Sequence, residues 1–117
     1  MEIYPKDGAI NIVEGAQKTI SCSSAGLIGT DPRDRILSWH HVVDGKEIKL
    51  DESVQVQHID HSSGDTNVDF ANLVFTKFNE ANDGVYICRR TLGSNVQQKN
   101  ISITMIPSKP VLMSRTT

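Results

Sequence analysis

Four residues constrain the fold of this chain more than any other feature: Cys22, Trp39, Tyr86 and Cys88. They include both cysteines and the only tryptophan of the sequence. In an extended strand Tyr86 and Cys88 share one face, because successive side chains alternate between the two faces. A zinc site would need further ligands at closer spacing. The cysteines are therefore expected to be structural, either as two separate buried thiols or as a pair.

The rest of the chain has the pattern of an all-β domain, because turn-forming residues separate short segments of alternating apolar and polar residues. Asp44-Gly45 is a hairpin signal, and Pro5 is expected to end the first edge strand. Residues 60–66 are predicted to form a polar turn and residues 92–95 a hairpin tip. The predicted strands are residues 3–4, 9–13, 17–24, 36–42, 46–50, 54–59, 68–75 and 99–105, with one more through Tyr86 and Cys88.

Length and charge limit the classes of function. The chain has 117 residues and a net charge of −2. This is the size of one domain, and it lacks the basic stripe of a nucleic-acid-binding protein. No apolar run approaches the ~20 residues that span a bilayer, so no direct membrane insertion is expected. Residues 1–7 are charged and lack the apolar core of a signal peptide. We expect a piece of a longer protein with further domains, in which residues 1–106 form one domain and residues 107–117 a linker or tail.

A set of motifs runs along most of the chain: Glu14-Gly15, Cys22, Trp39, Leu73-Val74-Phe75 and Asn82-Asp83-Gly84-Val85-Tyr86-Ile87-Cys88. Together these motifs resemble an immunoglobulin-superfamily domain of the I-set or variable-like type. The resemblance covers residues 1–106. Within the superfamily, residues 3–22 and 99–104 look most like membrane-distal domains of neural cell adhesion molecules, including the fasciclin II type.

This resemblance implies a β-sandwich of two antiparallel sheets with Greek-key connections and one inter-sheet disulfide. The disulfide would join Cys22 to Cys88 and pack on Trp39. The hydroxyl of Tyr86 would bond to backbone a few residues upstream. Leu73 and Phe75 would complete the core from a neighbouring strand.

Two departures from the family pattern are visible. Asn82 stands where the family usually has Asp, which puts in doubt the buried Asp–Arg ion pair of many variable-type domains. The interval between the cysteines is also longer than in a plain I-set domain. Residues 44–50 account for part of the excess, and they predict an extra strand on the sheet that carries Trp39.

Asn100-Ile101-Ser102 is an acceptor triplet for N-glycosylation. Alternation along the last strand places Asn100 on the outward face, where a glycan has room. The alternative is a triplet that occurs by chance and is not used. A glycan on Asn100 would shield part of the sheet that carries Cys88.

A candidate partner-binding patch lies in the loops before Trp39 and after Cys88, which the resemblance places at one end of the sandwich. Aliphatic side chains rimmed by arginine are typical of a protein interface. The alternative is that Leu27 and Ile28 fold back and cap the core. The residues of this predicted patch are Leu27, Ile28, Arg33, Arg35, Arg90 and Leu92.

The sequence gives no sign of an enzyme or of a cofactor. A metal site around His58 and His61 is improbable, because polar turn residues are usually solvated. His40 and His41 point to opposite faces of one strand and cannot act as one ligand pair. No nucleophile with an identifiable base and no phosphate loop is apparent.

Three functions fit these observations. The first is an extracellular module of an adhesion or recognition protein that binds itself or another protein, either through the predicted loop patch or through an exposed sheet face that carries Ile87 and Arg89. The second is an intracellular structural domain of a titin-like muscle protein, in which the thiols would stay reduced. The third is a receptor domain for a soluble ligand.

Overall fold

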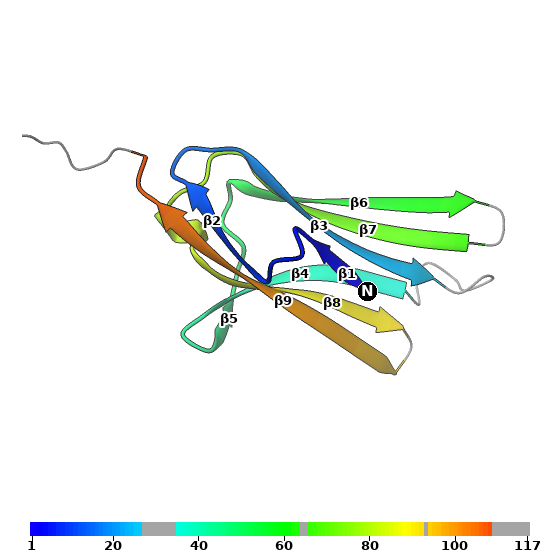
Figure 1. The fold of residues 1–117 in the computed structure, drawn as a ribbon. Coiled ribbons are helices and arrows are strands. Elements are labelled where there is room, and N and C mark those ends of the chain that lie inside the picture. The colour runs from blue at the N-terminus through cyan, green and yellow to red at the C-terminus, as the bar shows by residue number, and fades with distance from the viewer. Residues whose placement is uncertain (27–34, 64–65, 93, 109–117) are drawn as a thin grey trace, which may run out of the picture.

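The computed structural model describes residues 1–26, 35–63, 66–92 and 94–108 of the chain, and they form two packed sheets (Figure 1). This architecture confirms the predicted all-β sandwich. The four-stranded sheet has the order β1 (Glu2–Tyr4), β3 (Lys18–Gly26), β7 (Thr66–Phe75), β6 (Val54–Ser63). The five-stranded sheet has the order β2 (Ala9–Val13), β9 (Asn95–Ile106), β8 (Gly84–Leu92), β4 (Arg35–Val43), β5 (Lys46–Ile48).

The N-terminal segment crosses from one sheet to the other. β1 pairs antiparallel with β3, whereas β2 pairs parallel with β9. The crossing lies between Pro5, which follows a cis peptide bond, and Gly8, whose φ of 75° favours glycine. As a consequence β2 accompanies only the C-terminal half of β9 (Figure 1), from the pair Ala9–Ser102 to the pair Val13–Ile106.

A disulfide and a hydrogen bond join the two sheets. Cys22 on β3 is bonded to Cys88 on β8, with 6.5 Å between their Cα atoms. The indole Nε1 of Trp39 on β4 donates to the carbonyl of Ala71 on β7 at 2.8 Å. The expected pairing of the cysteines is therefore confirmed. The buried apolar core comprises Ile3, Ile12, Ile20, Cys22, Leu37, Trp39, Val54, Ala71, Leu73, Phe75, Phe78, Tyr86, Cys88, Ile101 and Ile103.

The corner before β8 is organised around Tyr86. Its hydroxyl donates to the carbonyl of Asn82 at 2.7 Å, as the family resemblance predicts. The ring of His41 stacks on the Tyr86 ring at 4.2 Å, and its Nε2 lies 2.9 Å from the carbonyl of Asp83. Burial raises the pKa of Tyr86, because the phenolate would lose its water. Both rings therefore have partners at their polar ends.

Asn82 has a structural role in place of the family's usual Asp. It is fully buried, and its Oδ1 accepts from the backbone N–H of Asn79 at 2.9 Å. The side chain of Asn79 in turn accepts from Ala81, so the short helix η2 (Glu80–Asn82) begins with a capping box. The amide oxygen of Asn82 therefore closes the capping box, whereas its buried Nδ2 has no hydrogen-bond partner among the described residues.

Several predicted boundaries are wrong. β6 continues to Ser63 and β7 begins at Thr66, so most of the predicted polar turn at 60–66 is paired strand. β9 begins at Asn95, ahead of the predicted start at residue 99. Polar side chains are compatible with strands here because one face of each ribbon meets water. The extra strand predicted from residues 44–50 is confirmed as β5, which follows a turn with positive φ at Asp44 and Gly45.

All described strands lie between Glu2 and Ile106. Only residues 107 and 108 of the predicted linker are described. The boundary between domain and linker stays a prediction.

Candidate binding surface

The outward face of the five-stranded sheet carries a hydrogen-bonded cluster around Arg89. The guanidinium of Arg89 donates through Nη2 to Glu47 Oε1 at 3.2 Å and through Nε to Gln98 Oε1 at 3.0 Å. Its Nη1 lies 3.3 Å from Nε2 of His40. One side chain from β8 thus links three strands, β5, β9 and β4. We call this surface the Arg89 face; its residues are Ser38, His40, Val42, Glu47, Val85, Ile87, Arg89 and Gln98.

The contacts of His40 define the tautomer of its neutral ring. A guanidinium can only donate, so Nε2 of His40 must be the acceptor toward Arg89. The proton is then on Nδ1, which donates to Glu47 Oε2 at 2.9 Å. The hydroxyl of Ser38 lies 2.8 Å from the same Nε2. Every polar side chain in the cluster is therefore held in one orientation.

The charges of the cluster are matched within the sheet. The hydrogen bond from Arg89 lowers the pKa of the Glu47 carboxyl, and the charge of Arg89 acts in the same direction. Arg89 is 29% exposed and Glu47 is 49% exposed, so water reaches both groups. An incoming protein surface would meet an ordered polar cluster whose residues are accessible.

Apolar side chains adjoin the cluster. Val42 and Val85 are directly paired across β4 and β8, and Ile87 is paired with His40. All three aliphatic side chains are partly buried. A small apolar centre beside an ordered arginine is the composition that protein interfaces favour.

The cluster contains one arrangement that the sequence did not reveal. A hydroxyl, an imidazole and a carboxylate lie in line at Ser38, His40 and Glu47, which is the order of an activated nucleophile. Arg89 competes with such chemistry, because its Nη1 lies 3.3 Å from the ring nitrogen that would take the proton of Ser38.

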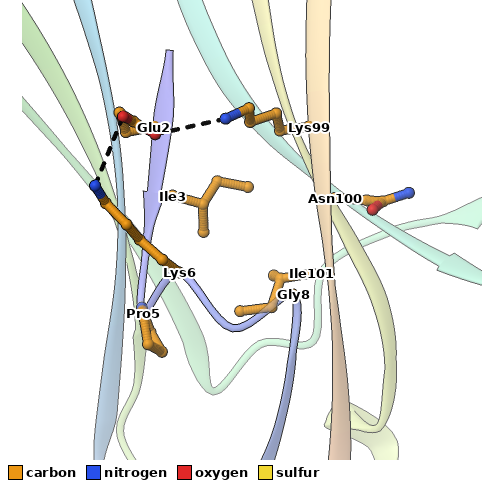
Figure 2. Close-up of a pocket in the computed structure, with 8 residues that line it drawn as sticks. All are labelled: Glu2, Ile3, Pro5, Lys6, Gly8, Lys99, Asn100 and Ile101. Atoms are coloured by element: carbon orange, nitrogen blue, oxygen red, sulfur yellow. Dashed lines mark hydrogen bonds and ion pairs between the residues drawn. The ribbon is translucent and has the colours of Figure 1, made fainter.

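A hollow of roughly 290 Å³ opens where the N-terminal segment crosses between the sheets (Figure 2). Ile3 and Ile101 face each other across it. At its rim Glu2 contacts Lys6 at 3.7 Å and Lys99 at 3.5 Å. The charge of Lys6 makes the largest contribution to lowering the pKa of Glu2, and Lys99 adds to it. Asn100, Pro5 and Gly8 complete the lining.

Asn100 is exposed, as predicted. It is paired with Ile87 of the Arg89 face. A glycan on Asn100 would therefore stand beside the apolar centre of this face, on the sheet that carries Cys88.

The predicted loop patch is described only in part. Leu27, Ile28 and Arg33 lie outside the described residues, as do the side chains of Arg35 and Leu92. The backbone pairs Arg35 with Leu92, so the start of β4 and the end of β8 meet at one end of the sandwich. Arg90 lies two residues before Leu92 on β8, and its guanidinium donates to the side chain of Gln97 at 3.3 Å.

The sequence offered the sheet face with Ile87 and Arg89 as an alternative interface, but it did not reveal the hydrogen-bonded cluster around Arg89. The signal available was alternation, which places Ser38 and His40 on one face of β4. The partner from β5 could not be found without the register of the Asp44-Gly45 hairpin, which pairs Val42 with Glu47. Arg89 could not be placed without the register between β4 and β8, which pairs it with Ser38.

Other predicted groups are easily located. His40 and His41 do point to opposite faces, one partly exposed and one buried. The side chains of His61, Asp60 and Asp65 lie outside the described residues. Among the residues that the structure describes, no helix is long and apolar enough to cross a membrane.

No family model and no curated protein sequence matches the chain, so the comparison rests on solved structures. A chain in the complex of Dpr2 Ig1-Ig2 with DIP-Theta Ig1-Ig3 superposes with a TM-score of 0.64 and 15% identity, over 89% of this chain and 32% of that chain. The titin I-band fragment I67-I69 gives a TM-score of 0.60 and 14% identity, over 85% of this chain and 30% of that chain.

A chain of the titin M10–obscurin-like 1 Ig complex gives a TM-score of 0.56 and 16% identity, over 87% of this chain and 89% of that chain. This chain has an immunoglobulin-like fold. At such low identity the likeness extends to the fold and not to a subtype, so the I-set or cell-adhesion-molecule assignment stays a prediction.

Proposed function

We propose that this chain is an extracellular protein-binding module of a cell-surface adhesion or recognition protein, and that it binds its partner through the Arg89 face. The observation that carries the proposal is the ordered cluster of Arg89, His40 and Glu47 beside an apolar centre. These side chains lie on the outward face of the sheet, where the core does not need them. Arginine is enriched among the residues that dominate binding energy in interfaces, and the centre of an interface is more apolar than its rim.

The disulfide supports the extracellular assignment, because protein disulfides persist in oxidising compartments. The exposed acceptor Asn100 fits the same route. Because Asn100 is paired with Ile87, a glycan on it would compete with a partner for the Arg89 face. The solved structures similar in fold include complexes of Dpr2 with DIP-Theta and of titin with obscurin-like 1 and with telethonin, so domains of this fold bind other proteins. The state of Cys22 and Cys88 in the natural protein separates an extracellular from an intracellular setting. A mass that corresponds to reduced thiols would favour the titin-like alternative.

Binding through one such domain is expected to be weak and to depend on multivalency between surfaces. The test is therefore a screen with the domain tetramerised on streptavidin against an array of ectodomains that includes the domain itself. Ile87→Arg should abolish binding to any partner found, because a long charged side chain would replace the apolar centre. Gln55→Arg, at an exposed position of β6 on the other sheet, is the matched control.

The loop patch predicted from the sequence is the competing location. Charge reversal at Arg33 and Arg35 should leave binding intact if the Arg89 face is the interface. Loss of binding in that variant, with Ile87→Arg still active, would move the interface to the loop end.

A further inference from the structure

The N-terminal half of β9 is an open sheet edge. β9 runs from Asn95 to Ile106, but β2 accompanies it only from Ser102 onward. β8 lies on its other side along the whole length from Asn95 to Ile103. Among the described strands, none pairs with residues 95–101 on the side that β2 would continue.

The direction of the backbone groups on this edge follows from the hydrogen bond between Ser102 and Gly8. The N–H of Ser102 donates to Gly8 at 2.9 Å, so it points away from β8. Backbone groups alternate in direction along a strand, so those of Val96, Gln98 and Asn100 point the same way. Three N–H and three C=O groups are thereby presented in a row, in a position to accept another strand.

The edge carries little protection against such pairing. Natural sheet edges are usually guarded by charge, proline or a bulge. From residue 95 to 101 the one charged side chain is Lys99, and Glu2 lies 3.5 Å from its ammonium group. Val96 is 57% exposed on this segment. The only charge that could oppose pairing along this segment is therefore that of Lys99, which Glu2 already neutralises.

We propose that the open edge of β9 pairs antiparallel with the same edge of a second copy of this chain, with a two-fold axis at Gln98. This inference concerns the backbone edge and does not rest on the proposed function of the Arg89 face. Gln98 would face its own equivalent, and Val96 would face Asn100 of the second copy. The pairing supplies about six backbone hydrogen bonds, two for each bonded pair.

Charge and space both favour a second copy as the occupant. In this register Lys99 faces Gln97 of the other copy, so no like charges meet. The Asn95 end of the second strand would run past Ile101 to the hollow of Figure 2, which exists because the crossing segment leaves β9 at Gly8. An edge contact of this size is small, so a weak, concentration-dependent dimer is expected.

The test is sedimentation velocity of the non-glycosylated chain over a wide concentration series. Gln98→Pro removes an N–H that points to the open edge and leaves the β8 ladder intact, as proline on an edge strand does. It should abolish the dimer. Gln98→Ala keeps the N–H at the same position, and it should retain the dimer.

A charge exchange at Gln98 tests the register of the two strands. It also keeps the proposal testable if the Gln98→Pro variant fails to fold. Gln98→Lys and Gln98→Glu each place like charges opposite each other on the axis. Each should weaken the dimer about fivefold, because like charges across strands cost up to about 1 kcal/mol. An equimolar mixture of the two variants should restore the dimer. Gln55→Lys, on the other sheet, should have no effect.

The outcomes are decisive in each direction. Gln98 also belongs to the Arg89 face, where it accepts from Arg89. Rescue by the mixture therefore establishes pairing through the β9 edge when Gln98→Pro abolishes the dimer and Ile87→Arg retains it. A strict monomer at the highest concentration overturns the proposal. A dimer that tolerates Gln98→Pro but is lost in Ile87→Arg also overturns it, and assigns self-association to the Arg89 face instead.

Discussion

Gly84 is the position where one methyl group is expected to disturb the fold most. A Cβ added there would lie 2.7 Å from Nε2 of His41, closer than two such atoms can approach, and 3.2 Å from the carbonyl of Val42. The φ of Gly84 is also 139°, a conformation that other residues rarely adopt. His41 would have to move, and it would lose its stacking on Tyr86 and its hydrogen bond to Asp83.

The magnitude of the Gly84→Ala effect has three parts. The strained backbone costs about 1–3 kcal/mol, the lost ring stacking about 0.5–1.5 kcal/mol and the lost hydrogen bond about 0.5–1.5 kcal/mol. We expect a loss of about 2–6 kcal/mol in the free energy of unfolding. Urea titration followed by Trp39 fluorescence measures it.

Gly15→Ala is the matched control, because Gly15 also has a positive φ, of 85°, but nothing lies within 4 Å of its added Cβ. It should cost about 1–2 kcal/mol through the backbone alone. In a His41→Ala background the Gly84→Ala change should become milder by at least about 1 kcal/mol. Equal losses for Gly84→Ala and Gly15→Ala, with no coupling to His41, would refute the reasoning.

Three further predictions concern the core, the Arg89 face and the glycan. Trp39→Ala should lower the free energy of unfolding by about 3–5 kcal/mol, because it leaves a cavity and removes the hydrogen bond to the Ala71 carbonyl; an unchanged melting temperature would contradict the burial of the indole. The pKa of Glu47 is lowered in the folded state, so its stabilising contribution is present above the ordinary carboxyl value of 4.5 and is lost as the pH falls below it. The melting temperature of Glu47→Gln should therefore fall less steeply than that of the wild type in this acid range, and parallel curves would show that the Arg89 contact is not made. Asn100→Gln should remove one glycan mass from material secreted by eukaryotic cells, whereas an unchanged mass would show that the acceptor is unused.

The core could be predicted because the types and positions of its main residues indicate that they are buried. Cysteine, tryptophan and tyrosine at these positions have few ways to be buried together, and Tyr86 and Cys88 must share a face whatever the details of pairing. The Asp44-Gly45 hairpin was equally local, since positive φ at both central residues selects these residue types. Strand ends were predicted less well. Polar residues in the β6–β7 and β8–β9 ribbons resemble turns in sequence but pair across the ribbon.

The Arg89 face could not be predicted, because its members come from four strands and meet only through register. Alternation placed Ser38 beside His40, but a one-residue slip of β5 or β8 would have taken Glu47 or Arg89 to the other face. The close approach of His41 to Gly84 was hidden for the same reason, since it depends on two strands meeting at one depth.

By itself, the sequence determined the all-β pattern and the shared face of Tyr86 and Cys88, because these follow from residue type and local alternation. Through its family resemblance it also implied the immunoglobulin-like sandwich, the pairing of Cys22 with Cys88 and the corner around Tyr86. The tertiary structure alone decided which polar side chains form an ordered surface and where the β9 edge is left open. The open edge arises because the N-terminal segment changes sheets near Gly8, and β2 then accompanies only half of its partner strand. Such features depend on where a strand begins relative to its neighbour, and the pattern of residues within one strand does not encode that position.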